Sequence, residues 1–286
     1  MLSLSEIKTF IENDANSEKK RLAKTGQRYY EADHDIKSYR VFYVDAEGNL
    51  KEDKTKSNIK ISHPFFTELV DQCVQYMLSG KDGFVRSGLP DLQKELDAYF
   101  NENEDFTAEL YEVLTGTQSK GFEYMYAYKN EEGRTSFQCA DSIGVIEVRA
   151  KECDDNCDHV IYWYVDRIGK DNKKIKRIQV WDDLQVAFFC QVDDGSIVPD
   201  ESAEINPRPH ILYHKDNDSA TYFDGFGFIP FFRLDNNRKQ TSGLKPIKLL
   251  IDDYDLMMCG LSNNLQDFDT PLIVVDGFQG DNLDEL

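Results

Sequence analysis

The stretch that decides the fold class runs from residue 103 to residue 128, where the spacing of apolar residues changes abruptly. Its first part reads Asn103-Glu-Asp-Phe-Thr-Ala-Glu-Leu-Tyr-Glu-Val-Leu114, and its second part reads Gly121-Phe-Glu-Tyr-Met-Tyr-Ala-Tyr128. Apolar side chains three or four residues apart in the first part predict an amphipathic helix, whereas the change to a period of two in the second part predicts a strand. A turn at Glu131-Glu-Gly133, followed by Thr135–Cys139, predicts a β-hairpin.

Helices are predicted before this stretch and strands after it. The earlier helices are one that carries Leu4, Ile7, Phe10 and Ile11, one over Phe65–Ser79 and one over Asp91–Asn101. Two strand-like runs, Arg40–Val44 and Asn58–Ile61, lie near a turn at Asp45–Asn49. The later strands are Ile143–Val148, His159–Asp166, Lys174–Trp181, Leu184–Val192, His210–His214 and Phe228–Arg233, with a loop over 193–209. Helices followed by antiparallel strands predict the α+β class.

A different helix is predicted towards the end of the chain, with Ser242 as its N-cap and Pro246 in its first turn. Its apolar residues alternate between spacings of four and three, and we call this stripe the seam: Ile247, Ile251, Tyr254, Met258, Leu261, Leu265 and Phe268. The pattern suits packing against another helix, and it also suits an ordinary core helix. An extended run over Pro271–Val275 follows, and because no closing element comes after it, we expect a truncated chain.

The chain is strongly acidic. Its 286 residues include 33 Lys and Arg against 53 Asp and Glu, so the formal net charge is −20. This charge argues against a protein that grips DNA through a broad basic face, and the basic run Lys19–Lys24 is interpreted as a solvated helix face. Aromatic residues make up 12% of the chain, which favours a folded protein. No stretch is apolar enough to span a membrane and no secretory leader is visible, so we expect no membrane partner.

The sequence contains no established catalytic motif, because the P-loop, nucleophile-elbow, dinucleotide and H-E-x-x-H patterns are all missing. Cys153, Cys157 and His159 hint at a metal, but a second ligand pair is missing, so we expect free thiols in an acidic loop. We expect neither a metal nor another cofactor.

The best enzyme-like cluster is Asp252-Asp253 together with Asp255, because acids on a helix can hold Mg²⁺ against a diphosphate. Asp252 and Asp255 share the side opposite the seam, which is also typical of a solvated face. The residues alone therefore leave open a Mg²⁺-dependent enzyme that uses these three acids, and a generic protein-interaction module.

Four segments of the chain resemble the portal proteins of tailed bacteriophages, specifically the siphophage type that forms the head-to-tail connector. These segments are Gln27-Arg-Tyr-Tyr-Glu-Ala-Asp-His-Asp-Ile36, His63–Gly80, Gly227-Phe-Ile-Pro-Phe-Phe-Arg-Leu-Asp-Asn-Asn237 and Leu244–Phe268 with Val274–Gly280. Each segment alone is weak, but four in the right order are specific. Ala32 stands where the family usually has glycine, and Cys73 stands where it usually has lysine.

The resemblance implies a structural subunit, not an enzyme, that forms a ring, typically of twelve copies, at one capsid vertex. Residues 1–240 would form the wing, 241–269 a stem helix and 270–286 the start of the clip, whereas the second stem helix, the tunnel loop and the crown are not in this chain. The implied partners are further copies of the chain, the terminase packaging motor, the major capsid protein and scaffold, and head-completion or tail adaptor proteins. The ring would be the channel for DNA entry in packaging and exit in ejection, without sequence-specific binding. The expected location is the virion, with the host cytoplasm during assembly.

Two sets of site residues follow from this interpretation. The seam is expected to pack against other subunits, because a ring subunit needs a helix with a second packing surface. Asp252, Asp255 and Asp267 are expected to face the channel, because acidic side chains keep the wall of a DNA pore from holding phosphates.

Overall fold

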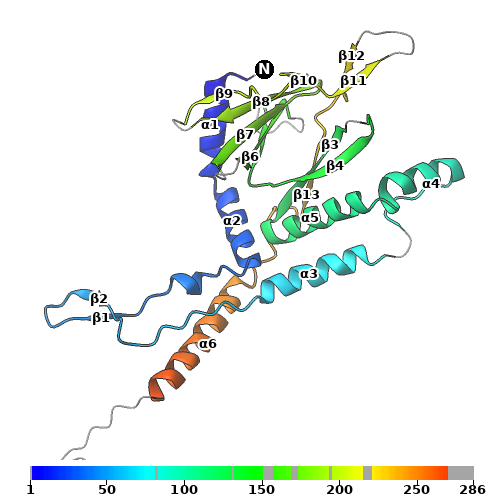
Figure 1. Cartoon of the computed structure of the whole chain (residues 1–286). Helices are drawn as coiled ribbons and strands as arrows, with labels where there is room; N and C mark the ends of the chain where they lie inside the picture. Colours follow the sequence, from blue (N-terminus) through cyan, green and yellow to red (C-terminus); the bar gives the residue numbers. More distant parts are fainter. Residues whose placement is uncertain are drawn as a thin grey trace, which may run out of the picture. The chain divides into compact units, whose positions relative to one another are not determined.

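The computed structural model describes residues 2–80, 83–130, 132–150, 157–168, 173–192, 195–214 and 221–269. The chain forms two compact units, each made of two separate stretches of sequence. Unit 1 comprises residues 1–31 and 66–246, and unit 2 comprises residues 32–65 and 247–286. The chain therefore leaves unit 1 after its second helix, returns to it at residue 66 and enters unit 2 again at residue 247 (Figure 1).

The helices of unit 1 begin and end at residues suited to these positions. They are α1 Leu4–Ala15, α2 Glu18–Tyr30, α3 Phe65–Leu78, α4 Pro90–Leu96, the π-helical turn η2 Asp97–Asn101, and α5 Glu104–Lys120. The first residue of α3, Phe65, is assigned to unit 2 and the rest of the helix to unit 1. Ser3 and Glu6 form a capping box at the start of α1. Asn103 caps α5 by accepting the Phe106 N–H, and Gly121 ends α5 with a φ of 101°, in the left-handed region that favours glycine.

The strands of unit 1 are all paired antiparallel among the described residues. They are β3 Phe122–Lys129, β4 Thr135–Ala140, β5 Val145–Val148, β6 His159–Ile168, β7 Lys173–Trp181, β8 Gln185–Gln191, β9 Ile197–Pro199, β10 Arg208–Pro209, β11 Ile211–His214, β12 Thr221–Asp224 and β13 Phe231–Asp235. The largest sheet has the order β10-β8-β7-β6-β5 with β9 on β8, a second has the order β13-β3-β4, and β11 pairs with β12. Helices combined with antiparallel sheets confirm the predicted α+β class.

Two apolar clusters form the core of unit 1. In one, Ile7 and Ile11 of α1 are buried together with Ile161 and Ile178 of the largest sheet. In the other, aromatic rings join the two sheets, and the Phe231 ring lies 5.1 Å from that of Tyr126 and 5.4 Å from that of Trp181. Helix α1 and the β13-β3-β4 sheet therefore each bury apolar surface on the largest sheet.

A close approach of α2 to α5 depends on Gly26. A methyl group at this position would overlap the carbonyl oxygen of Ser119, so only glycine fits without a shift of the backbone. The same carbonyl oxygen accepts a hydrogen bond from the Ser242 hydroxyl. One small residue thus allows three segments of unit 1 to meet at one backbone group.

Lys20 of α2 is only 3% exposed, so the predicted solvated basic face is wrong at this residue. Its ammonium group donates to the carbonyl oxygens of Ser142 and Val145 and lies 3.3 Å from an Asp14 carboxylate oxygen. Burial lowers the pKa of Lys20, whereas the charge of Asp14 favours the protonated form.

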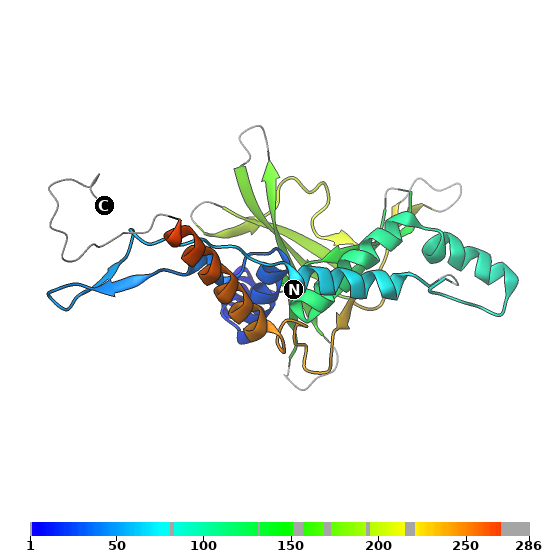
Figure 2. The same cartoon turned by 90° about the horizontal axis from the view of Figure 1, so that it is seen from below.

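Unit 2 contains a 3-10 turn, a hairpin, an extended segment and one long helix. Their bounds are η1 Asp35–Ser38, β1 Phe42–Val44, β2 Leu50–Glu52 and α6 Lys248–Phe268, and the extended segment over residues 57–63 is called the strap below. Asp45 closes the hairpin turn, because its carboxylate accepts the N–H groups of Glu47 and Asn49. The strap leads from this hairpin to α3 and runs beside α6 (Figure 2).

Several predicted bounds are corrected by the structure. Residues 58–61 are not a strand, since they belong to the strap, and the partner of β1 is β2, directly after the turn. The predicted loop over 193–209 contains β9 and β10. Ser242 does not cap α6, because α6 begins only at Lys248. The hydroxyl of Ser242 instead accepts a hydrogen bond from the Leu244 N–H. The extended run 271–275 lies outside the described residues.

Candidate functional site

Helix α6 has one fully buried stripe. Ile251, Asp255 and Cys259 are spaced four residues apart and are 5%, 0% and 3% exposed. Because four residues advance a helix by slightly more than one turn, these side chains lie one above another on the same side. A carboxylate in the middle of such a stripe needs hydrogen-bond partners inside the unit.

The strap supplies partners along this side of α6. The backbone N–H groups of Ser57, Ile59, Ile61 and His63 donate to the side chains of Asp267, Asn263, Cys259 and Asp255, with donor–acceptor distances of 3.3, 2.6, 3.2 and 3.0 Å respectively. We call these four bonds the ladder. Two residues of extended chain rise about 6.6 Å and four residues of helix rise about 6 Å, so every second strap residue meets every fourth helix residue. The ladder fastens the strap antiparallel to α6.

One end of the ladder is locked by two histidines. The Nδ1 atoms of His34 and His63 lie 2.6 and 2.7 Å from the two carboxylate oxygens of Asp255. Since an ionised carboxylate only accepts hydrogen bonds, each ring donates a proton from Nδ1. His34 is 1% exposed and Asp255 is completely buried, whereas the side chain of His63 is 24% exposed. Asp255 therefore ties together three segments of unit 2: the start of η1, the strap and α6.

The side of α6 away from the ladder is apolar and exposed. It carries five side chains that are each more than half exposed: Leu250, Met257, Leu261, Leu265 and Phe268. We call this set the outward face. Helical spacing places these residues on one stripe, roughly opposite Asp255 and Cys259. A large exposed apolar stripe of this kind is typical of a surface that is covered by a partner.

The predicted seam is divided between the two sides of α6. Ile251 is buried inside unit 2, and Ile247, Tyr254 and Met258 are partly buried. The remaining members of the seam, Leu261, Leu265 and Phe268, lie on the outward face. The sequence pattern thus combined residues that pack inside the unit with residues that stay exposed on it.

The three predicted channel-facing acids lie in different surroundings. Asp255 is completely buried, so the expectation that it lies on a solvated face is wrong, because the residues that bury it come from distant parts of the sequence. Asp252 accepts a hydrogen bond of 2.7 Å from Lys248, which also donates to Asp35. Asp267 is exposed and accepts the Ser57 N–H at the last rung of the ladder.

The acids of the possible magnesium site are not brought together. Asp253 is exposed, whereas both oxygens of Asp255 are taken by histidines and the strap. Among the residues that the structure describes, no group of three or more His, Cys, Asp or Glu side chains could hold a metal ion. Of the cysteines that hinted at a metal, Cys157 is a free thiol and Cys153 lies outside the described residues.

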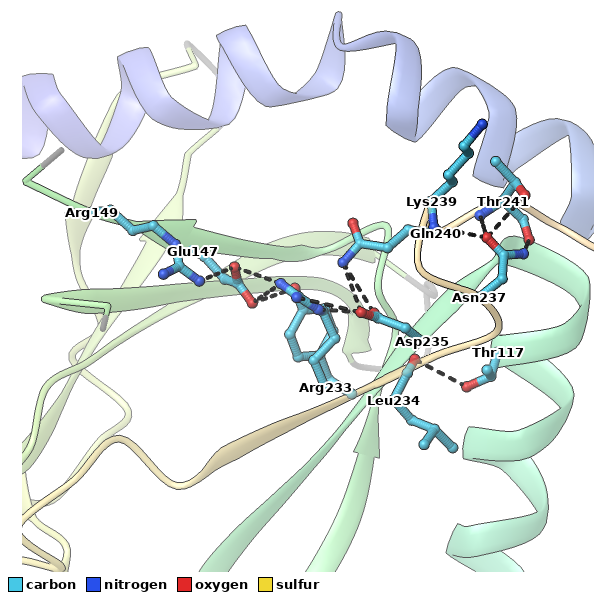
Figure 3. A network of polar contacts seen from close by, with 11 residues as sticks. Thr117, Glu147, Arg149, Arg233, Leu234, Asp235, Asn237, Lys239, Gln240 and Thr241 are labelled. Atoms are coloured by element: carbon cyan, nitrogen blue, oxygen red, sulfur yellow. Dashed lines mark hydrogen bonds and ion pairs between the residues drawn. The ribbon is translucent and has the colours of Figure 1, made fainter. Parts of the chain in front are cut away.

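Unit 1 contains a separate polar network around Glu147 (Figure 3). Both Glu147 oxygens accept from Arg233, at 2.7 and 2.8 Å, and Arg149 donates to one of them at 2.8 Å. The Tyr124 hydroxyl also donates to Glu147, and Arg233 donates to Asp235. Burial raises the pKa of Glu147, but the bond from Arg149 and the charge of Arg233 outweigh it and lower the pKa. The network joins β5 to β13 through paired charges.

A fully buried acid of unit 1 is Glu123 on β3, which is 1% exposed and paired with Lys120. The Ser142 N–H also donates to this carboxylate. Burial nevertheless dominates and raises the pKa of Glu123 to about 7. The group lies against Gly116 of α5, where any larger side chain would overlap it. Glu123 therefore belongs to the packed interior of unit 1, and its raised pKa makes the stability of that unit depend on pH.

Comparison with known proteins defines the class. Residues 9–286 match the family described as phage portal protein, SPP1 Gp6-like. The chain therefore belongs to this family of phage portal proteins, which confirms the resemblance found from four short segments.

Two curated relatives are portal proteins of phages. The chain is 28% identical over 263 residues to the portal protein of Bacillus phage SPP1, which covers 91% of this chain and 50% of that protein. A 61-residue stretch is 33% identical to the portal protein of Clostridium phage phiCD119, over 21% of this chain and 14% of that protein. The chain spans about half the length of the SPP1 protein and a smaller part of the other. No helix among the described residues is long and apolar enough to cross a membrane.

The ladder is the feature that sequence reasoning missed. A signal for it exists, because Asp255, Cys259, Asn263 and Asp267 repeat a hydrogen-bonding side chain every four residues. The strap offers a weaker signal, because its four donors are backbone N–H groups at residues 57, 59, 61 and 63, and any residue other than proline could supply them. Neither run indicates the other, since about 200 residues separate them.

Proposed function

We propose that this chain is a structural portal subunit, without catalysis of its own, that forms a ring with its own copies at one vertex of the phage capsid. In this role the ring is the channel for DNA during packaging and ejection, and the docking site for the packaging motor and the tail. Membership of the portal family over residues 9–286 is the observation that carries the proposal. The structural support is α6, whose outward face is apolar and exposed while its opposite side is fastened by the ladder.

The parts of the chain take the following roles in this proposal. Residues 1–240 form the wing, α6 and the residues just before it form a wall of the stem, and residues 270–286 begin the clip. Because 32–65 belongs to the same compact unit as α6, we assign the strap to the support of the stem helix. The packing surface between subunits consists of the exposed members of the seam, Leu261, Leu265 and Phe268, and excludes Ile251.

The proposed partners are further copies of the chain, the terminase motor, the major capsid protein and scaffold, and head-completion or tail adaptor proteins. The location is the virion, and the host cytoplasm during assembly. Duplex DNA passes through the channel without sequence-specific binding. A net charge of −20 supports this last point, because an acidic wall does not bind phosphates.

Asp252 and Asp267 remain candidates for the channel wall, and Asp255 does not. We expect charge reversal at the exposed Asp267 to Lys to slow DNA passage or increase DNA retention in assembled particles, with Asp253→Lys as a comparison on the same helix. Packaging and ejection rates equal to those of the wild type would remove Asp267 from the channel wall.

The proposal is tested by the mass and shape of the protein in solution. Light scattering and negative-stain imaging are applied to this chain and to a version extended through the crown. We expect closed rings from the extended version, and ring formation by this chain to be weaker because it carries fewer packing elements. If both proteins stay monomeric across the whole accessible concentration range, the portal-ring role is contradicted.

A further inference from the structure

The β1–β2 hairpin of unit 2 is a second exposed apolar surface. All six strand residues are exposed, and Val44 pairs directly with Leu50 in the register. Phe42, two residues from Val44, lies on the same face because side chains alternate along a strand. These three side chains are each more than half exposed.

A hairpin of this kind is marginal on its own. An isolated pair of strands needs a third strand or a packing surface for stability in water. Within the described residues, β1 and β2 form a sheet of two strands only. Local contacts hold the turn and the ends, through Asp45 with Lys51 and Arg40 with Glu52. They leave the apolar face uncovered, and the tip of the hairpin projects away from the rest of unit 2 (Figures 1 and 2).

The charges beside the two exposed apolar surfaces are complementary. Residues 37–60, which contain the hairpin, carry six Lys and Arg against four Asp and Glu, whereas residues 248–269 carry one Lys against five Asp. The first stretch is therefore net +2 and the second net −4, in a chain that is net −20 overall. Lys54 and Lys56 after the hairpin and Asp253 beside the outward face are all exposed. The hairpin itself, residues 42–52, carries one Lys against three Asp and Glu, so the basic residues after it, Lys54 and Lys56, are the ones that suit the acidic surface of α6 in charge.

We propose that the apolar face of the hairpin in one copy of this chain docks on the outward face of α6 in the next copy. This inference rests on the proposed ring, and it names the two surfaces that meet between neighbouring subunits. Both surfaces are exposed in a single chain, so neither covers the other within it. A contact between two different surfaces is heterologous, and repetition of such a contact closes a ring or extends a filament. Each copy would thus contribute a hairpin to one neighbour and a helix to the other.

The first test is a mixing experiment with two double variants of the chain. The hairpin variant carries Phe42→Ser and Leu50→Ser, the helix variant carries Leu261→Ser and Leu265→Ser, and the control carries Leu184→Ser, an exposed leucine of unit 1. In sedimentation velocity, we expect each double variant alone to need at least about tenfold more protein to assemble, which corresponds to 1.4 kcal/mol per contact. The control should assemble like the wild type.

The mixture of the two double variants gives the decisive result. One intact hairpin and one intact outward face are present, so a heterologous contact predicts dimers that cannot grow further. Self-association of either double variant alone, as strong as in the wild type, contradicts the proposal and points to a contact between two hairpins or between two helices. If both double variants still form rings like those of the wild type, this docking proposal is contradicted, while the proposed ring function stands.

The second test locates the contact directly. A photo-crosslinking amino acid replaces Phe42, and unlabelled chain is mixed with ¹⁵N-labelled chain so that links between copies are recognised by mass. We expect links from the hairpin of one copy to residues 249–268 of another. Links within one copy, links to residues 270–286 or the absence of any link between copies overturn the proposal, whether or not the wild-type chain forms rings.

Discussion

Removal of the Asp255 carboxylate should release the strap from α6 while leaving unit 1 intact. In Asp255→Ala, the rings of His34 and His63 and the His63 N–H all lose their acceptor. A buried donor left without an acceptor costs about 1–3 kcal/mol, and three donors lose their acceptor here, so we expect a loss of about 4 kcal/mol in the local stability of unit 2. Asp255→Asn keeps one acceptor oxygen and should lose about half as much.

The two units can be observed separately. Both tryptophans, Trp163 and Trp181, belong to unit 1, so their fluorescence in a urea titration reports the unfolding of that unit. Hydrogen exchange of the Ile59 and Ile61 amides reports the strap, because these N–H groups donate to side chains of α6. At 1.4 kcal/mol per tenfold change, a loss of about 4 kcal/mol accelerates this exchange by up to about a thousandfold.

A matched control lies three residues earlier on the same helix. Asp252→Ala removes a partly exposed pair with Lys248, which is worth less than about 1 kcal/mol. Its strap amides should exchange within a few-fold of the wild-type rate. If Asp255→Ala also leaves the Ile59 and Ile61 amides within about tenfold of wild type, the buried cluster does not fasten the strap, and the reasoning from its burial is refuted.

Three further predictions concern single residues. Lys20→Met should destabilise unit 1 by about 3 kcal/mol, because the carbonyl oxygens of Ser142 and Val145 and the carboxylate of Asp14 all lose the ammonium group. Lys24→Met at an exposed position should change the urea midpoint little, and equal midpoints for the two variants would contradict this role of Lys20. Because the pKa of Glu123 is raised from 4.5 to about 7, the folded state holds its proton more tightly than the unfolded state, so the stability it contributes is complete below about pH 4.5 and is lost as the pH rises to 7. Glu123→Gln should therefore flatten the dependence of the urea midpoint on pH between 5 and 8, by up to the order of 3 kcal/mol, and an unchanged slope would show that the acid is ionised throughout. Ala32→Gly should stabilise unit 2 by about 1 kcal/mol, because Ala32 has a φ of 54° in the left-handed region, where glycine is not strained; slower exchange of the strap amides would be the sign, and faster exchange would count against it.

The fold class was predictable because it depends on local pattern. The change of period at Gly121 occurs where α5 ends and β3 begins, since glycine provides both the helix end and the start of the alternating run. The pairing of β1 was less predictable. The turn at Asp45–Asn49 was found, but its second strand was placed at 58–61, because the isoleucines there are more typical of a strand than Leu50-Lys-Glu52 is.

The surroundings of α6 were not predictable from its own residues. The expectation that Asp255 lies on a solvated face opposite the seam overlooked Ile251, a member of the seam that lies one turn before it on the same side. The partners of Asp255 come from residues 34 and 63, and no local pattern records a contact over so many residues. The exposed end of the seam, from Leu261 to Phe268, could be identified as apolar but not as uncovered.

The ladder joins two repeats of slightly different length, so bonding positions on the strap and on α6 coincide only over a limited stretch. Each rung advances the strap by about 6.6 Å and the helix by about 6 Å, so the two drift apart by about 0.6 Å per rung and by about 2 Å between the first rung and the last. N–H···O hydrogen bonds keep donor–acceptor distances of about 2.7–3.2 Å, so the side chains of α6 must absorb most of this drift. The bond at Ser57, at one end of the ladder, is the longest of the four at 3.3 Å, and that at Ile59 is the shortest at 2.6 Å.

This difference in rise works against a longer ladder. Each further rung would add about 0.6 Å to the offset that the side chains must absorb. A shift of the strap by one rung would also place His63 opposite Ile251, which has no acceptor. The acceptor side chains at every fourth position of α6 therefore set the alignment of the strap, and the mismatch of the two repeats works against a longer ladder.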